Sequence, residues 1–161
     1  MPAIAKSYAC NIFPCLYYRD APAAIEWLSK AFGFSKRLAV PGEGGTIIHA
    51  EMTFGAGLIM LSSSKPERGR VSPRDLAAVH QVISVCVEDP DAHFARAKAA
   101  GAEIIQELKS EEYGARGYMV KDLEGNHWYF GTCRPKMKSC GSHRPSFSLS
   151  RNRGRGSGMP R

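Results

Sequence analysis

Residues 122–132 read DLEGNHWYFGT, and this stretch indicates the fold more clearly than any other part of the sequence. Its first half, Asp122 to Asn126, is typical of a tight turn, because Gly and Asn tolerate the backbone angles that such turns need. Its second half alternates side chains as a half-buried strand does, with His127 and Tyr129 on one face. The stretch therefore predicts a hairpin whose last strand closes a larger unit.

That larger unit has a counterpart near the start of the chain. Each copy has an apolar run, an Asp, a Pro, apolar residues at helical spacing and a Gly. These signals are the run 13–18 with Asp20, Pro22 and Gly33, and the run 82–87 with Asp89, Pro90 and Gly101. Asp suits a helix N-cap, Pro the first turn and Gly the C-terminal cap, so we predict helices at 21–32 and 90–100. The repeated order predicts a duplicated module.

The remaining runs predict four strands in each module. They lie near 11–18, 35–40, 46–54, 57–62, 81–87, 103–108, 116–121 and 127–132. The predicted fold class is α+β: two tandem βαβββ modules, at about 11–62 and 81–134, form a curved mixed-sheet cup with the helices on its outer face. A linker at 63–80 joins the modules, and a connection of that length is commonly a lid, a partner contact or a mobile linker.

Length and charge predict one folded domain followed by a basic tail. The chain has 161 residues, 43% of them apolar, which suffices for one core at residues 1–135. Those residues hold 15 of the 22 Lys and Arg and all 15 Asp and Glu, so the net charge of +7 comes from residues 136–161. We predict that this tail is disordered and has no role in the main function. We expect no nucleic-acid partner, except through non-specific contact of the tail with phosphates. No apolar stretch has the length of a membrane span, and we expect a cytoplasmic protein.

Strand alternation indicates which side chains share a face. Around His49 and Glu51 the polar side chains alternate with apolar ones, and the apolar ones should pack under a helix. The same rule places Trp128 and Phe130 under a helix. The side chains expected on the open side are those of Phe13, Cys15, Tyr17, His49, Glu51, Thr53, Val82, Ser84, Cys86, His127 and Tyr129. A cup with this mixed aromatic and polar lining suits a small organic molecule.

The chain resembles the vicinal oxygen chelate superfamily, which includes glyoxalase I, extradiol dioxygenases, fosfomycin-resistance enzymes and bleomycin-resistance proteins. The resemblance covers about residues 11–135, and the ending at 128–132 resembles the glyoxalase/bleomycin-resistance branch. Besides the paired modules, it rests on the motifs at 19–21, 32–34, 49–51 and 122–128. One scaffold carries several chemistries in this superfamily, so the resemblance does not specify a reaction.

Metal-dependent members of the superfamily take ligands from the first, fourth, fifth and eighth strands. The resemblance places these positions at Phe13, Met60, Val82 and Tyr129, which have neither imidazole nor carboxylate groups. A shift of one residue does not restore a ligand at any of them. Since nothing at these positions would polarise a carbonyl or activate a water, we expect no metal cofactor.

Two alternatives remain open for the polar residues of the cup. His49, Glu51 and His127 offer two imidazoles and a carboxylate, a ligand set that suits iron or another first-row metal. Glu51 or His127 would otherwise serve as an acid or base without a metal. Against both stands an ordinary structural role, in which His49 and Glu51 hydrogen-bond across the sheet and His127 packs beside Tyr129.

By resemblance, the expected function is metal-independent binding of an aromatic or otherwise flat organic compound in the cup, by a homodimer. The alternative is a glyoxalase-like lyase or isomerase, or another enzyme of the superfamily, that uses the rebuilt metal site or the Glu51/His127 pair. The residues expected to bind the ligand are Phe13, Cys15, Tyr17, His49, Glu51, Met60, Ser84, Arg116, His127 and Tyr129.

Structural roles are also possible for three further residues, Arg116, His80 and His93. Arg116 would either clamp an anionic group of the ligand or pair with Glu111 or Glu112 at the rim of the cup. We expect His80 to mark the start of a strand and His93 to lie on an exposed helix face.

Overall fold

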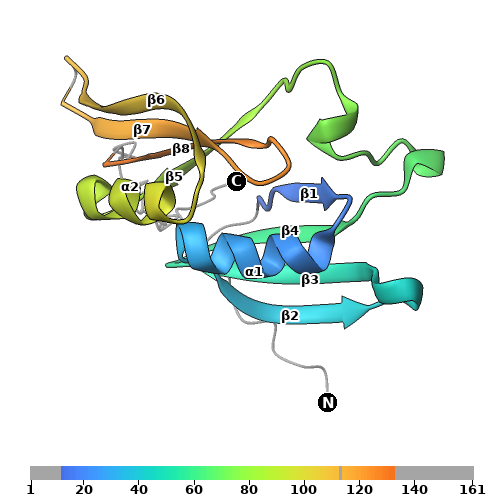
Figure 1. Cartoon of the computed structure of the whole chain (residues 1–161). Helices are drawn as coiled ribbons and strands as arrows, with labels where there is room; N and C mark the ends of the chain where they lie inside the picture. The colour runs from blue at the N-terminus through green and yellow to red at the C-terminus, as the bar shows by residue number, and fades with distance from the viewer. Residues whose placement is uncertain (1–11, 113, 133–161) are drawn as a thin grey trace, which may run out of the picture.

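The protein consists of two βαβββ modules in tandem, and the computed structural model describes residues 12–112 and 114–132 (Figure 1). The first module contains β1 (Cys15–Tyr18), α1 (Ala21–Phe32), β2 (Ser35–Pro41), β3 (Ile47–Phe54) and β4 (Gly57–Ser63). The second contains β5 (Val82–Cys86), α2 (Pro90–Ala99), β6 (Glu103–Ser110), β7 (Arg116–Lys121) and β8 (His127–Gly131). The predicted tail, residues 136–161, lies outside the described residues.

Each module forms one four-stranded mixed sheet with its helix on one face. The strand orders are β1-β4-β3-β2 and β5-β8-β7-β6, and the duplicated pattern extends to the pairing. β1 runs parallel to β4 and β5 runs parallel to β8, whereas the other neighbours are antiparallel. The predicted α+β fold class of two tandem modules is confirmed. Within the described residues, neither helix is long and apolar enough to cross a membrane.

Local signals set the ends of both helices as predicted. The side chain of Asp20 accepts a hydrogen bond from the backbone N–H of Ala23 at 3.0 Å, and Asp89 accepts one from Ala92 at 2.9 Å. At the other end of α1, Gly33 has a φ of 81°, which a residue without a Cβ adopts at little cost. The N-caps and this glycine therefore explain why both helices begin, and α1 ends, where the sequence indicates.

One hydrophobic core joins the two modules. Phe32 at the end of α1 packs against Trp128 and Phe130 of β8, with ring centroids 5.6 and 4.7 Å apart. All three side chains are fully buried, as the strand alternation predicts for the two β8 residues. Burying side chains of this size contributes about 1.5–3 kcal/mol each, so the aromatic contacts hold the modules together as one body.

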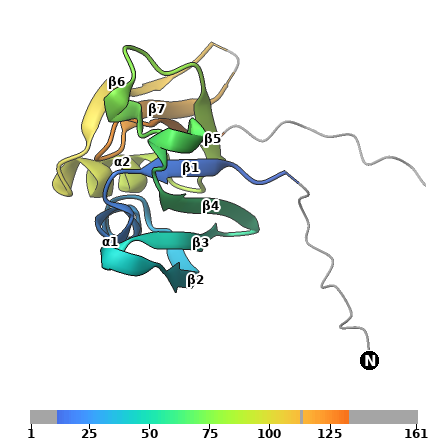
Figure 2. The same cartoon turned by 90° about the vertical axis from the view of Figure 1, so that its right-hand side faces the viewer.

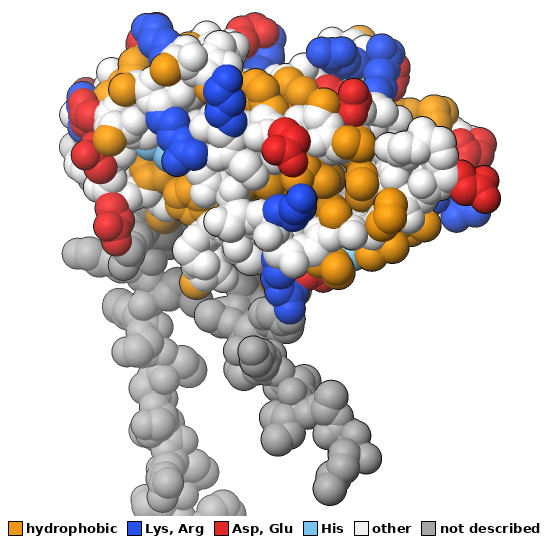
Figure 3. Space-filling model, turned by 60° about the horizontal axis from the view of Figure 1, so that its bottom comes forward, with side chains coloured by type: hydrophobic (Ala, Val, Ile, Leu, Met, Phe, Trp, Pro, Cys, Tyr) orange, Lys and Arg blue, Asp and Glu red, His pale blue; other side chains and the backbone are white. Residues whose placement is uncertain are grey.

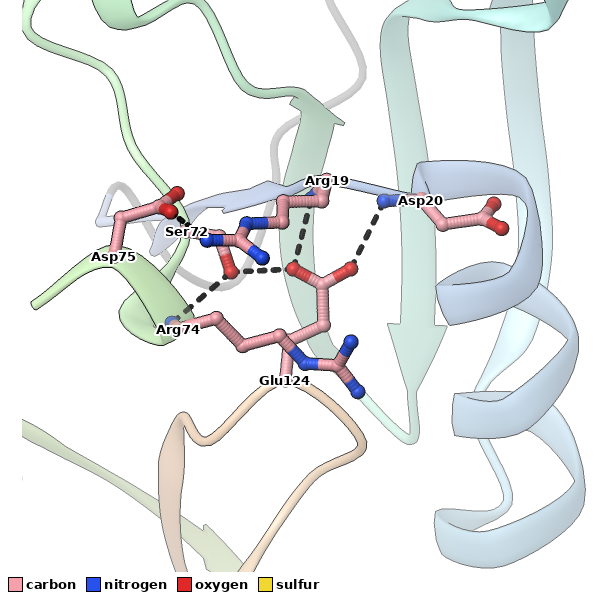
Figure 4. Close-up of polar contacts among 6 residues, drawn as sticks. All are labelled: Arg19, Asp20, Ser72, Arg74, Asp75 and Glu124. Carbon is pink, nitrogen blue, oxygen red and sulfur yellow. Dashed lines mark hydrogen bonds and ion pairs between the residues drawn. The ribbon is translucent and has the colours of Figure 1, made fainter.

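The second module also binds the start of α1 (Figure 4). Glu124, in the β7–β8 turn, accepts hydrogen bonds from the backbone N–H groups of Arg19 at 2.7 Å and Asp20 at 2.9 Å. Its carboxylate is buried and lies at the positive end of the α1 dipole, where a negative charge is stabilising. The turn that the sequence predicts is therefore also a contact between the modules.

The neighbouring Asp122 is the acceptor at the centre of a second buried cluster. The Tyr18 hydroxyl donates to its Oδ2 at 2.7 Å, and the Asn126 amide and the Trp128 indole donate at 2.9 and 3.2 Å. Burial, followed by the nearby negative charge of Asp122, raises the pKa of Tyr18 well above its usual value. Tyr18 therefore stays protonated and links β1 to the second module.

His93 and Arg96 of α2 bind the other end of α1. Nε2 of His93 donates to the carbonyl oxygen of Phe32 at 2.9 Å, and Nδ1 accepts from the Tyr118 hydroxyl at 2.7 Å. Arg96 donates to the carbonyls of Lys30 and Ser29 at 2.8 and 2.7 Å. The prediction that His93 lies on an exposed helix face is wrong, because the packing of the two helices, which local spacing does not encode, half-buries this ring.

Candidate functional site

The edge strands β1 and β5 lie next to each other where the modules meet, and we call the space between them the seam (Figure 2). A smaller and a larger cavity lie along it, and both take residues from the two modules. The segment from 64 to 81, which we call the connector, leads from β4 to β5 past this seam. It contains two short 3-10 turns, Pro66–Arg68 and Pro73–Asp75.

The smaller cavity has a volume of about 450 Å³ and one wall made by the connector, so we call it the connector cavity. Residues from β1, the connector, β5 and β8 line it, among them Cys15, Tyr17, Leu76, His80, Ile83 and His127. Three residues from the predicted ligand site, Cys15, Tyr17 and His127, thus come together here. His80 and the connector were missed, although the length of the connector was a signal that this segment carries a role.

Side-chain contacts hold the connector in place over the seam (Figure 4). Ser72 is fully buried and its hydroxyl donates to the Glu124 carboxylate. Arg74 donates to the carbonyl oxygen of Leu123 at 2.8 Å. Arg19 pairs with Asp75 and holds the pKa of that carboxyl below its usual value, although an exposed pair of this kind adds little stability. The wall of the cavity is therefore attached to both modules.

The larger cavity, of about 990 Å³, is more apolar. Phe34, Phe54 and Leu58 of the first module and Ile83 and Val85 of β5 line it. Ser84, a residue of the predicted ligand site, lies among them. This cavity is large enough for a small molecule, and Glu88, Asp89, His93 and Arg96 join Ser84 as its polar lining.

On the open face of the first sheet, Glu51 is already engaged within the chain. The register places Glu51 opposite Met60 of β4, and Met60 opposite Cys15 of β1, so these three predicted residues form a row across the sheet. The Glu51 carboxylate pairs with Arg37, and its Oε1 lies 3.2 Å from Nε2 of His49. His49 and Glu51 thus hydrogen-bond along β3, and the contact across the sheet is the one between Glu51 and Arg37 of β2. A carboxylate between two basic groups is poorly placed to act as a free base.

On the open face of the second sheet, Tyr129 lies flat over two glycines. The register pairs Gly117 with Gly131, and Tyr129 with Ser84 of β5. A Cβ at Gly117 would lie 2.5 Å from the Tyr129 hydroxyl oxygen, and a Cβ at Gly131 would lie 2.7 Å from it. Any side chain larger than that of glycine at position 117 or 131 would therefore clash with the Tyr129 ring. The ring is partly exposed and its oxygen is buried, but Tyr129 lines neither cavity.

The possible metal ligands of the cup do not gather at one place. His49 and Glu51 are neighbours on β3 of the first sheet, whereas His127 lies on β8 of the second and lines the connector cavity. Within residues 12–112 and 114–132, no group of three or more His, Cys, Asp or Glu lies close enough to hold a metal ion.

Arg116 and Phe13 lie away from both cavities. Arg116, at the start of β7, donates two hydrogen bonds to Asp91 of α2, at 2.7 and 2.8 Å, and lowers the pKa of that carboxyl. The alternative pairing with Glu111 or Glu112 is wrong. The planar guanidinium binds Asp91 instead, which is distant in the sequence and is brought beside Arg116 by the fold. Phe13 precedes β1 and is partly buried.

Known proteins resemble this chain over the described fold. The family model of the Glyoxalase/Bleomycin resistance protein/Dioxygenase superfamily matches residues 10–130. An uncharacterized protein of Mycobacterium tuberculosis (strain ATCC 25618 / H37Rv) is 35% identical over 121 residues, which cover 73% of this chain and 71% of that protein. The crystal structure of TioX from Micromonospora sp. ML1 is 37% identical, with a TM-score of 0.60, over 75% of this chain and 98% of TioX.

A more distant solved structure shares the fold alone. It is a glyoxalase/bleomycin resistance protein/dioxygenase family enzyme from Burkholderia phytofirmans PsJN, which is 16% identical with a TM-score of 0.60. The match covers 74% of this chain and 94% of that enzyme.

Proposed function

The chain belongs to the Glyoxalase/Bleomycin resistance protein/Dioxygenase superfamily, and within that family we propose that it binds a small organic molecule, aromatic or otherwise flat, without a metal ion. The observation that carries this proposal is the connector cavity. Its volume of about 450 Å³ falls in the range of about 300–1,000 Å³ that is typical of sites for small ligands.

The lining of the connector cavity suits a flat compound with a polar edge. Tyr17 contributes an aromatic ring, and Leu76 and Ile83 contribute aliphatic surface. His80 and His127 add hydrogen-bonding groups that would fix the orientation of a ligand. Tyr129 lies on the open face of the second sheet. We assign its ring to the same cup as a further stacking surface.

Two features favour binding without a metal over metal-assisted catalysis. The positions that hold ligands in metal-dependent relatives by resemblance carry Phe13, Met60, Val82 and Tyr129. The carboxylate of Glu51 is compensated by Arg37 and His49. A glyoxalase-like enzyme would need this carboxylate, the imidazole of His127 or a metal to move a proton or polarise a carbonyl.

We also propose that the protein is a homodimer, as the family resemblance implies. The face in Figure 3 carries apolar side chains between scattered charges. On the first sheet, Leu38, Val40 and Ile48 are 44%, 38% and 54% exposed, although each is a large apolar residue. A second copy would bury such surface. Analytical ultracentrifugation should give twice the chain mass, and Leu38→Lys together with Val40→Lys should shift the protein towards the monomer.

A thermal-shift screen of metal-stripped protein against a panel of aromatic compounds tests the binding proposal. A ligand should raise the melting temperature in proportion to its affinity and concentration. Tyr17→Ala should abolish this shift, whereas Tyr17→Phe, which keeps the ring, should retain most of it. Ile105→Ala, on the edge strand β6 away from the cavity and from the proposed dimer surface, is the matched control and should bind as the parent does.

Metal content is the measurement that separates the proposal from the enzyme alternative. Protein purified without chelator should carry well under one equivalent of nickel, zinc, iron or manganese, and adding these ions should leave the melting temperature unchanged. One bound equivalent, lost together with the binding of ligand on chelation, would overturn the proposal in favour of a metal-dependent enzyme.

A further inference from the structure

We propose that the ligand of the connector cavity is a planar aromatic acid, meaning a flat ring system that carries a carboxylate or an ionised phenol. This inference rests on the proposed function and names the chemical class of its ligand. It is drawn from the hydrogen-bond donors that line the cavity and from the guanidinium of Arg70 beside it.

The groups that line the cavity favour an anion. His80 and His127 are its imidazoles, and Cys15 contributes a thiol, whereas no Asp or Glu is among the lining residues. The guanidinium of Arg70, on the connector, lies 5.7 Å from the centroid of the Tyr17 ring. Imidazole and guanidinium groups both donate hydrogen bonds to carboxylate and phenolate oxygens. An acidic edge on the ligand would therefore find donors here.

The acidic residues beside this wall are already bound within the chain. Asp75, on the connector, pairs with Arg19, and two more lie in the β7–β8 turn. Asp122 accepts from Tyr18, Asn126 and Trp128, and Glu124 accepts from the backbone at the start of α1 and from Ser72. These contacts compensate both carboxylates inside the protein. Of the cavity lining only Asn126 is used in these contacts, so the imidazoles of His80 and His127 are left for the ligand.

The apolar part of the lining sets the shape of the ligand. Tyr17 comes from β1, Leu76 from the connector and Ile83 from β5, so a ligand that touches all three spans the width of the seam. The guanidinium of Arg70 lies over the Tyr17 ring and places a cation beside this surface. A planar ring system contacts such surfaces with little loss of conformational freedom.

A matched pair of probes tests the acidic group. Isothermal titration of the full chain at neutral pH should show that 1-naphthoate binds about tenfold more tightly than 1-naphthamide, because only the carboxylate forms charge-assisted hydrogen bonds. His80→Gln, His127→Gln and Arg70→Gln should each reduce this preference severalfold. His49→Gln is the matched control, since this imidazole lies on β3 outside the cavity. Circular dichroism melts of each variant check that it folds.

The outcomes separate this inference from the proposed function. Equal binding of the two probes, abolished by Tyr17→Ala, would overturn the acid class and leave the binding function standing. Binding of neither probe, nor of any other aromatic acid in the panel while neutral aromatics bind, would also overturn it. A naphthoate preference that falls in His49→Gln but survives all three cavity variants would overturn the location.

Discussion

At the scale of single residues, the close packing of Tyr129 against Gly131 predicts how much each of the two residues contributes to stability. A Cβ at Gly131 would lie 2.7 Å from the Tyr129 hydroxyl oxygen and 2.9 Å from the carbonyl oxygen of Arg116. Gly131→Ala should therefore lower the free energy of unfolding by about 1–3 kcal/mol, the usual cost of overpacking. Gly131→Ala should cost less in a Tyr129→Ala background than in the parent, because the first of the two clashes is then absent. Urea denaturation measures both effects.

A comparison glycine and a conservative variant sharpen this prediction. At Gly57 an added Cβ meets its nearest atom at 3.3 Å, so Gly57→Ala should cost less than Gly131→Ala. Tyr129→Phe should leave ligand binding nearly unchanged, since the buried oxygen does not face a ligand. If Tyr129→Phe weakens binding as much as Tyr129→Ala does, the ring is not a stacking surface.

His93 predicts how stability depends on pH. Burial is the main cause that lowers the pKa of His93 from its usual value of 6.5, so the unfolded chain takes up this proton at a higher pH than the folded chain does. The stability that depends on the neutral ring is complete above about pH 6.5 and is lost as the pH falls through the lowered pKa. The melting temperature should therefore fall between about pH 7 and pH 5.

A variant without an imidazole isolates this contribution. His93→Gln keeps a donor for the Phe32 carbonyl but does not titrate, so its melting temperature should decline less steeply over the same range. The other histidines are present in both proteins and cancel in the comparison. Parallel curves for the parent and His93→Gln would show that another group causes the pH dependence.

At the scale of elements, the N-terminus of α1 depends on a side chain from the other module. Glu124 accepts two backbone hydrogen bonds there and is 3% exposed. Glu124→Ala leaves buried donors without an acceptor, and bonds to a charged acceptor contribute about 1.5–3 kcal/mol. We expect Glu124→Ala to lower the free energy of unfolding by about 3 kcal/mol, and Glu124→Gln by roughly half as much, as measured by urea denaturation.

Variants of the connector provide the matched comparison. Glu67 lies on the same connector, but it is exposed, so Glu67→Gln should change stability by less than about 0.5 kcal/mol. Ser72→Ala removes the donor that Ser72 gives to Glu124 and should cost about 1 kcal/mol. Equal losses for Glu67→Gln and Glu124→Gln would contradict the role of Glu124 at the start of α1.

The elements themselves could be predicted because their signals are local. Asp20 and Gly33 determine the ends of α1 through contacts within a few residues, and the predicted range 21–32 matches the helix. Strand alternation identified Trp128 and Phe130 as buried for the same reason. Contacts such as that of Glu124 with Arg19 join residues far apart in the chain, so a turn signal at 122–126 gave no indication of them.

At the scale of the whole molecule, the candidate site was predictable only in part. Strand alternation correctly placed His49 and Glu51 on the same face. It does not indicate how the two sheets are arranged relative to each other. The connector cavity depends on that arrangement, which explains why His80 was missed. The arrangement follows from long-range contacts at both ends of α1, made by Glu124 at one end and by His93 and Arg96 at the other.

These contacts predict that the two modules unfold together. Each module contains one tryptophan, Trp27 in α1 and Trp128 in β8, so single-tryptophan variants report on the modules separately. In Trp27→Phe and in Trp128→Phe, the urea midpoint from fluorescence should equal the midpoint from circular dichroism of the same variant, because neither module keeps its core when the other unfolds. Adding Arg96→Ala should lower both midpoints equally. A fluorescence midpoint that differs from the circular dichroism midpoint in either variant would mean that α1 does not couple the modules.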